Sequence, residues 1–343
     1  MTATPADAWT WSGEPTVHRH DIGLINQTFT VEVDGEFAAI LQRLNTDIFV
    51  PEVHEDIEAI TGALEASGLP TTRLLRTATG DLWHTDAEGG VWRALTPIGD
   101  RTIEKLADVG DARSAGALVA RFHAALQGFT WEFRSVRAGA HDTDSHMDRL
   151  ARAVDQQRKH RLWWDTASLS ETIGEGWRTL EIPEGLPTRV IHGDLKISNV
   201  RFTGPEATAL IDLDTLAWGT LDIELGDAMR SWCNPTAEDD LEARFDLEIF
   251  RAAMKGYAEG CGDRGPTELE WSSIIPGLER ICWELASRFA LDALNESYFG
   301  WDKGNYPAAG EHNLARARGQ VQLAKSVRKQ RADAEQALRE ARS

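Results

Sequence analysis

The sequence predicts an α+β protein with a small β-rich N-terminal lobe and a larger, mainly helical C-terminal lobe. Short alternating apolar runs separated by turn residues fill much of residues 1–96, whereas residues 97–343 mostly place apolar side chains at helical spacing. The exception in the second part is a pair of short strands between residues 190 and 215, which carries several acidic and amide side chains. We therefore expect one lobe over 1–96 and the other over 97–343.

The N-terminal lobe is expected to contain an antiparallel sheet and one helix. A strand that ends at Val33 turns back at Asp34-Gly35 and returns over 36–44, as in a tight hairpin. A helix is predicted over 52–67 because Gly68 follows a run of apolar residues at helical spacing. Three further strands are expected over residues 73–77, 81–86 and 90–95.

Helical periodicity accounts for most of the C-terminal lobe. Ser170 is expected to cap the start of one helix. The other helices are expected over residues 111–126, 145–161, 222–232, 236–257, 267–295 and 311–343.

The stretch with the most chemical information begins after a short apolar strand. It reads Val190-Ile-His-Gly-Asp-Leu-Lys-Ile-Ser-Asn-Val200 and is followed by Ala209-Leu-Ile-Asp-Leu-Asp-Thr215. The residues between the two runs favour a hairpin, with Gly204 in its turn. In that hairpin we expect Val200 to pair with Ile211.

This pairing would place Asn199 opposite Asp212, with Asp194 a few residues upstream. Carboxylate and amide oxygens that converge in this way suit a hard cation such as Mg²⁺. Phosphoryl transfer needs one carboxylate to receive the proton of the acceptor hydroxyl, and further oxygens to hold the metal on the phosphates. The spacing therefore points to phosphoryl transfer.

The run His192-Gly-Asp-Leu-Lys-Ile-Ser-Asn199 with Ile211-Asp212 resembles the catalytic signature of the aminoglycoside phosphotransferase and choline kinase superfamily, the small-molecule relatives of protein kinases. The resemblance implies a bilobal protein-kinase-like fold and an ATP- and Mg²⁺-dependent transfer to a hydroxyl group. It implies that Asp194 is the catalytic aspartate and that Asn199 and Asp212 hold Mg²⁺.

Within that superfamily, residues 211–215 and 225–230 are similar to the N-acetylhexosamine 1-kinase group, and so are residues 23–29 with residues 40–45 and Phe49. The likeness covers roughly residues 17–232 and implies a sugar or amino-sugar acceptor, with the anomeric hydroxyl as one candidate position. An antibiotic phosphotransferase of the aminoglycoside type is the alternative, because the same fold and motif serve both.

Two further charged residues near the motif have expected roles. Lys196 is a candidate clamp on the γ-phosphate, and Asp214 is a candidate contact to a second metal ion or to the acceptor. We expect His192 to orient the catalytic loop, and Asp227 to brace that loop through its backbone amides. A surface position for Lys196 is the competing interpretation.

The nucleotide is expected to contact the N-terminal lobe and the hinge. Asn26 and Thr28 lie in a weak glycine loop in which only Gly23 remains, and Arg43 is the candidate cation because the expected strand lysine is missing. An exposed strand arginine is an equal alternative for Arg43. Glu55 or Glu58 is the candidate acid to pair with it. Backbone groups near Leu95 and Ile98 are expected to meet the adenine.

The acceptor pocket is expected in the helical lobe. On the predicted helix 267–295, Glu284 and Arg288 share a face at four-residue spacing, and Trp283 precedes them. These three are the candidate substrate-binding residues beside Asp194 and Asp214.

Composition limits the function classes. The 36 basic and 55 acidic residues give a formal net charge of −19, which disfavours nucleic-acid binding. Cys233, Cys261 and Cys282 are widely spaced, and we expect a reducing, cytoplasmic location for the protein. We expect no membrane span and leave the oligomeric state open.

Two other function classes stay open. A metal hydrolase would use His192, Asp194, Asp212 and Asp214 as a two-metal cluster. A nucleotide-binding module without turnover would explain the missing strand lysine and the weak glycine loop.

Overall fold

The computed structural model describes residues 5–20, 25–137 and 139–343. A six-stranded antiparallel sheet occupies the N-terminal part, in the order β1-β2-β3-β6-β4, with β5 also paired to β6. Its strands are β1 (Pro15–His20), β2 (Gln27–Val33), β3 (Glu36–Arg43), β4 (Leu74–Leu75), β5 (His84–Thr85) and β6 (Val91–Leu95). A single turn of 3₁₀ helix, Ala6–Ala8, precedes the sheet.

The first hairpin follows from its turn residues. Asp34 and Gly35 have φ values of 54° and 82°, and a two-residue turn with both φ values positive matches the twist of the flanking strands. One face of the sheet then buries Phe29, Val31 and Leu41 with Trp92. The opposite face is left for side chains that meet the rest of the molecule.

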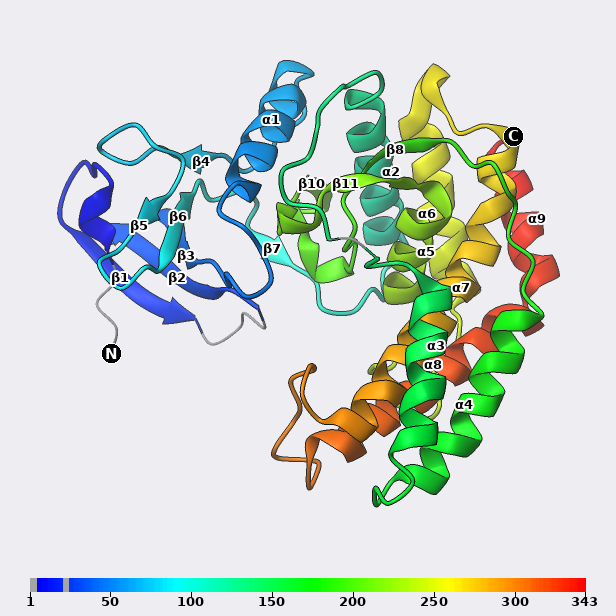
Figure 1. The fold of residues 1–343 in the computed structure, drawn as a ribbon. Helices are drawn as coiled ribbons and strands as arrows, with labels where there is room; N and C mark the ends of the chain where they lie inside the picture. Colours follow the sequence, from blue (N-terminus) through cyan, green and yellow to red (C-terminus); the bar gives the residue numbers. More distant parts are fainter. Residues whose placement is uncertain (1–4, 21–24, 138) are drawn as a thin grey trace.

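The C-terminal part is mainly helical, and two small strand pairs carry the predicted motif. In Figure 1 the sheet lies at the left and the helices at the right, with α1 (Val53–Ala66) and β7 (Arg101–Thr102) between them. The helices are α2 (Val109–Ala125), α3 (Thr143–Gln156), α4 (Trp163–Arg178), α5 (Leu221–Trp232), α6 (Leu247–Cys261), α7 (Glu268–Asn295), α8 (Ala309–Lys329) and α9 (Arg331–Ala341). The strand pairs are β9 (Val200–Thr203) with β10 (Glu206–Leu210), and β8 (Thr188–Ile191) with β11 (Ala217–Thr220).

The helix α1 ties the two parts together. Its buried Asp56 accepts hydrogen bonds from the Trp131 indole at 2.8 Å and from the backbone N–H groups of Arg134 and Ser135 at 2.9 Å. Ile57 and Ile60 of the same helix join the large apolar core that continues through the C-terminal helices. The bilobal α+β prediction is confirmed, and one continuous core joins the lobes. The boundary between residues 96 and 97 stays a prediction: β6 ends at Leu95, and β7 already pairs with β9.

Several predicted helix boundaries were wrong, and the helix expected over 145–161 already ends at Gln156. The helix expected over 236–257 begins at Leu247, because the Asp246 side chain caps it through the N–H groups of Glu248 and Ile249. Ser170 lies inside α4 rather than at its start.

The single helix expected over 311–343 is divided into α8 and α9. The interruption lies at Gln330, whose backbone has φ −100° and ψ 11° and whose side chain donates to the carbonyl of Phe245 at 2.9 Å. A contact with another part of the chain therefore accompanies the break.

Candidate active site

The loop after β8 is held by hydrogen bonds that involve both ring nitrogens of His192. The imidazole is fully buried, its Nε2–H donates to the carbonyl of Ile211 at 2.9 Å, and its Nδ1 accepts the N–H of Asp194 at 3.3 Å. The ring thus links the loop to the end of β10. The structure places His192 as an orienting residue, as expected from the sequence.

The Glu224 carboxylate of α5 holds the backbone of the same loop. Its two carboxylate oxygens accept the N–H groups of His192 at 2.8 Å and Gly193 at 3.0 Å. Burial opposes ionisation of Glu224, but its hydrogen bond with His123 and the nearby His192 keep its pKa below the usual value. Gly193 has φ 77°, and a Cβ there would lie 2.6 Å from the carbonyl oxygen of Thr215, so only glycine fits.

The bracing acid was predicted to be Asp227, and this was wrong. Asp227 Oδ1 accepts from Arg230 at 3.1 Å, and its Oδ2 is buried without a hydrogen-bond partner among the described residues. Glu224 and Asp227 lie three residues apart on one helix, and the sequence analysis named only Asp227 for this role. The tertiary position of α5 decides between them.

The hairpin that follows differs from the prediction by one residue. Val200 pairs with Leu210 rather than with Ile211, because the turn is tight, with Thr203 opposite Glu206, and the irregularity between Ala207 and Ala209 offsets only part of this difference. The N–H of Ile211 then donates to the Asn199 carbonyl at 2.9 Å. Asp212 follows with φ 64° and ψ 54°, a left-handed conformation that is uncommon for a residue with a side chain.

The predicted side chains nevertheless meet. The Lys196 ammonium nitrogen lies 2.8 Å from Asp194 Oδ2 and 3.8 Å from Asp212 Oδ2. The Asn199 amide nitrogen donates to the backbone carbonyl of Asp194 at 2.9 Å and to its Oδ2 at 3.2 Å. We call these four residues, Asp194, Lys196, Asn199 and Asp212, the carboxylate cluster.

The electrostatics of the cluster favour a bound cation. Burial raises the pKa of Asp212, and the neighbouring carboxylates of Asp214 and Asp194 add to the effect, so a positive ion there would stabilise its charged form. Burial also opposes ionisation of Asp194, but the Lys196 ammonium lowers its pKa below the usual value. The oxygens of Asn199 and Asp212 are of the type that Mg²⁺ prefers, so the residues present fit this ion.

Asp214 forms hydrogen bonds with residues outside the carboxylate cluster. Both of its oxygens bind the Arg93 guanidinium, with Nη2 at 2.8 Å from Oδ2, and Asn26 donates to Oδ2 at 2.7 Å. The amide oxygen of Asn26 in turn accepts the N–H of Asn45 at 2.9 Å. Asp214 is therefore directed toward Arg93, and Asn26 toward Asp214 and the backbone of Asn45; the acceptor, metal and nucleotide contacts predicted for them stay predictions.

The predicted strand cation, Arg43, is not brought to the cluster. Its guanidinium lies 6.0 Å from the Trp92 ring centroid, on the outer face of the sheet. Gln42 has the opposite orientation, donating to the Thr28 hydroxyl at 3.2 Å and accepting from Arg93 at 2.9 Å. The buried cation near the cluster is thus Arg93 of β6, which the sequence analysis did not single out.

The acids predicted to pair with the strand cation bind other arginines. Glu55 lies 3.6 Å from Arg134, and Glu58 accepts from Arg76 at 2.8 Å.

Of the predicted hinge positions, Leu95 pairs with both Ile40 and Leu74, and the carbonyl of Ile98 accepts from Arg201 Nε at 2.9 Å. Gly23 lies outside the described residues.

The three residues predicted for the acceptor pocket point to separate places. Trp283 is buried and donates to Glu279 at 3.0 Å, and Glu284 accepts from the Thr143 hydroxyl at 2.7 Å. Arg288 lies with its guanidinium 5.8 Å from the Phe299 ring centroid. These contacts bind α7 to its neighbours, and they do not define a pocket beside Asp194.

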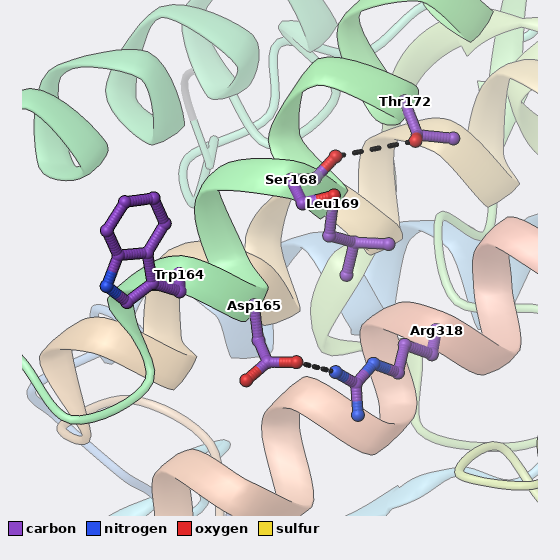
Figure 2. Close-up of a pocket in the computed structure, with 6 residues that line it drawn as sticks. All are labelled: Trp164, Asp165, Ser168, Leu169, Thr172 and Arg318. Atoms are coloured by element: carbon purple, nitrogen blue, oxygen red, sulfur yellow. Dashed lines mark hydrogen bonds and ion pairs between the residues drawn. The ribbon is translucent and has the colours of Figure 1, made fainter.

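One hollow in the helical part is also separate from the cluster. A shallow groove of about 320 Å³ lies between α4 and α8. Figure 2 shows the side chains that line it, with an ion pair between Asp165 and Arg318. Its lining residues are Trp164, Asp165, Ser168, Leu169, Thr172 and Arg318. It contains no residue of the carboxylate cluster.

The geometry does not favour the two-metal hydrolase. His192 and Asp214, two of its four proposed ligands, already bind a backbone carbonyl and an arginine. Within the described residues, no group of three or more His, Cys, Asp or Glu side chains is placed to hold a metal ion. In the same part of the chain, no helix is both long and apolar enough to cross a membrane.

A sheet-rich lobe, a helical lobe and an Asp-Asn-Asp cluster on the loops beside a short hairpin define a protein-kinase-like fold. The chain belongs to the phosphotransferase enzyme family, whose model matches residues 16–260. It is 27% identical over 209 residues to a homoserine kinase from Rhodopseudomonas palustris (strain BisA53), a match that covers 56% of this chain and 58% of that protein.

Solved structures share the fold across nearly the whole chain. The microcompartment-associated aminopropanol kinase has a TM-score of 0.62 at 17% identity, covering 96% of each chain. The GDP complex of wild-type aminoglycoside 2'-phosphotransferase-IIIa has a TM-score of 0.60 at 14% identity, covering 89% of this chain and 92% of that chain. A putative aminoglycoside phosphotransferase from Ralstonia eutropha JMP134 has a TM-score of 0.58 at 14% identity, covering 94% and 95%. At these identities the likeness shows the fold alone.

Proposed function

We propose that the protein is a small-molecule kinase that transfers the γ-phosphate of ATP to a hydroxyl group of a sugar or amino sugar. The observation that carries the proposal is the carboxylate cluster, in which Lys196 lies within 4 Å of both Asp194 and Asp212 and Asn199 donates to Asp194. Membership of the phosphotransferase enzyme family supports the reaction class. The resemblance of residues 211–215 and 225–230 to N-acetylhexosamine 1-kinases supports the acceptor class.

In this proposal each member of the cluster has one task. Asp194 orients the acceptor hydroxyl and receives its proton, for which its lowered pKa keeps it ionised at neutral pH. Asn199 and Asp212 would hold Mg²⁺, which neutralises charge on the phosphates when bound. Lys196 balances the two carboxylates and remains the candidate clamp on the transferred group.

Amino alcohols are a second acceptor class. The homoserine kinase and the aminopropanol kinase named above act, by their names, on small molecules that carry both an amino and a hydroxyl group. An aminoglycoside-type antibiotic is the third, supported by the structural neighbours that act on such compounds.

The test is a screen for ADP release with Mg·ATP over N-acetylhexosamines, hexosamines, aminoglycosides, homoserine and aminopropanol, with NMR of each product to locate the phosphate. We expect one acceptor class to give turnover well above the ATPase background, and the Asp194→Asn variant to lose it. A hexosamine product supports the full proposal. Turnover only with an amino alcohol or antibiotic would overturn the acceptor, and turnover with none would overturn the kinase assignment.

A further inference from the structure

Arg93 and Asp214 form a buried ion pair between the sheet and the loop that carries Asp212. Arg93 lies on β6 and is 1% exposed, and Asp214 lies two residues after Asp212 and is 2% exposed. The two terminal guanidinium nitrogens bind the two carboxylate oxygens, with Nη2 to Oδ2 at 2.8 Å. This is the planar, two-point contact that arginine makes and lysine cannot.

The pair is fixed by further bonds from the sheet. Arg93 Nε donates to Gln42 of β3 at 2.9 Å, and Asn26 donates to Asp214 at 2.7 Å. Gln42 is itself held by the Thr28 hydroxyl of β2. Three neighbouring strands and the segment before them thus set the position of one guanidinium and one carboxylate. A charge buried this deeply persists only when it is paired and hydrogen-bonded.

Asp214 lies in the short turn Leu213–Thr215, and the end of that turn is bound to the loop that carries Asp194. Thr215 donates its hydroxyl to the carbonyl of His192 at 2.8 Å. Asp212 therefore stands at the start of a short turn, Leu213–Thr215, whose Asp214 is held by the sheet and whose Thr215 is held by the loop of Asp194. These two attachments help to keep Asp212 in its left-handed backbone conformation.

The arrangement replaces the pair expected from the sequence. That expectation placed the cation on β3 at Arg43 and the acid on α1 at Glu55 or Glu58. In the structure, the buried cation lies on β6 and the acid lies beside the predicted metal ligand Asp212. The sheet is therefore connected to the loop that carries Asp212 and Asp214, rather than to helix α1.

We propose that Arg93 is a positioning residue that acts through Asp214 to set the orientation of the Asp212 carboxylate. The inference rests on the proposed function, because it assigns a purpose to the geometry of a magnesium ligand. Nε and both terminal nitrogens of Arg93 already bind Gln42 and Asp214, so in this proposal Arg93 acts without a phosphate contact and aligns the sheet with the loop that carries Asp212. Its loss would weaken the metal-dependent part of nucleotide binding and leave the metal-independent part.

The experiment measures ADP affinity by isothermal titration calorimetry, with Mg²⁺ and with EDTA, for the wild-type protein and for Arg93→Met, Arg93→Lys and Asp214→Asn. We expect Mg²⁺ to lower the dissociation constant of ADP for the wild type. In each variant, the ratio of the dissociation constants in EDTA and in Mg²⁺ should be at least about tenfold smaller than in the wild type. Binding in EDTA should change by less than about twofold. Arg93→Lys should resemble Arg93→Met, because the two-point contact is lost in both.

The double variant Arg93→Met/Asp214→Asn separates action through Asp214 from direct action. We expect it to be no worse than either single variant, since both changes break one link. Additive losses, or a loss of ADP affinity in EDTA, would show that Arg93 contacts the nucleotide itself and would overturn the inference.

Two further proteins keep the result interpretable. Arg73→Met is the matched control, because Arg73 adjoins β4 and pairs with Glu58 and Glu65 away from Asp214, and it should leave the Mg²⁺ effect unchanged. Gln42→Met removes the bonds to Arg93 Nε and to the Thr28 hydroxyl but leaves the Arg93–Asp214 ion pair, and it should give a smaller shift in the same direction if the stronger variants do not fold. A lower unfolding temperature with an unchanged Mg²⁺ effect would show a merely structural pair and overturn the inference. Failure of the wild type to bind Mg·ADP would instead overturn the proposed function.

Discussion

At the scale of single residues, burial and neighbouring charges shift the pKa values of the two acids in the cluster. Asp194 has a lowered pKa because the Lys196 ammonium outweighs its burial, whereas Asp212 has a raised pKa because burial and two carboxylates act together. Two acids 18 positions apart thus have opposite shifts in one site. The acid with the lowered pKa stays ionised and is therefore free to accept a proton, whereas a positive ion beside the other acid would stabilise its charged form.

The first residue-scale prediction concerns Asp194→Asn. The amide preserves the shape and the contact with Asn199 but cannot receive the proton of the acceptor, so we expect kcat to fall by about 10²–10⁴-fold. ADP release with the acceptor found in the screen measures it, and circular dichroism of the variant serves as the folding control. Turnover within about threefold of the wild type in a folded variant would remove Asp194 from the proton-accepting role.

A second prediction concerns the pH dependence of stability. His54 is fully buried, and burial first, with Arg93 second, lowers its pKa to about 4. In the unfolded chain the pKa returns to about 6.5, so between these values the unfolded chain binds a proton that the folded protein does not. The free energy of unfolding should therefore fall as the pH falls from about 6.5 to about 4, by up to about 3 kcal/mol from this residue.

Urea unfolding at several pH values, for the wild type and His54→Phe, measures this contribution. The phenyl ring keeps the stack on Trp83, whose centroid lies 5.3 Å from the imidazole, but cannot take up a proton. We expect a smaller pH slope for the variant, even if its stability at neutral pH is lower. His123 and His146, whose pKa values burial also lowers, are common to both proteins. Equal slopes would contradict the prediction.

At the scale of elements, the catalytic loop depends on close packing between α5 and α7. A Cβ at Gly277 of α7 would lie 2.1 Å from the carbonyl oxygen of Asp222 at the start of α5. That helix carries Glu224, which binds the N–H groups of His192 and Gly193. Helix-to-helix distance therefore controls where the loop lies.

We expect Gly277→Ala to destabilise the protein by about 1–3 kcal/mol through overpacking, even though alanine is the better helix former. Because α5 must shift, activity should also fall at temperatures where the variant is folded. Gly256→Ala is the matched control: its Cβ would lie 1.9 Å from the carbonyl oxygen of Arg113, but it presses α6 on α2. We expect a similar loss of stability there with little loss of kcat. Equal losses of kcat in both variants would refute the link between α5 and the loop.

At the scale of the whole molecule, the site joins residues from the sheet and from the helical part. Arg93 and Asp214 are 121 positions apart in sequence, and Asn26 and Asp214 are 188 apart. The Asp56 bonds from α1 to residues 131–135 make a second connection between the two parts. We infer that unfolding is cooperative across both lobes.

A ligand that bridges the lobes should then raise the midpoint temperature of a single unfolding transition. We expect ADP with Mg²⁺ at one hundred times its dissociation constant to add about 2.7 kcal/mol to the free energy of unfolding. EDTA should remove most of this gain in stability. In Asp212→Asn, ADP should give the same stability with Mg²⁺ as with EDTA. Calorimetry or thermal shift measures it. Two separate transitions, of which only one responds, would contradict a shared unfolding unit.

The sequence by itself determined the class of fold and most members of the cluster. The hairpin turn at Asp34-Gly35, the helix periodicity and the spacing of Asp194, Asn199 and Asp212 are local patterns, so they could be predicted without coordinates. The helix expected over 267–295 and the observed α7, Glu268–Asn295, differ by one residue at the start for the same reason.

Only the tertiary structure decided which residues brace the site. Arg93 stands in an apolar strand, and its burial hints at a partner, but the partner is 121 residues away. Glu224 and Asp227 are equivalent acids until the placement of α5 turns one toward the loop, and Arg43 and Gln42 differ only in which sheet face meets the cluster. The one-residue register shift at Ala207 likewise depends on strand pairing. Such choices are set by contacts between distant segments, which no local pattern encodes.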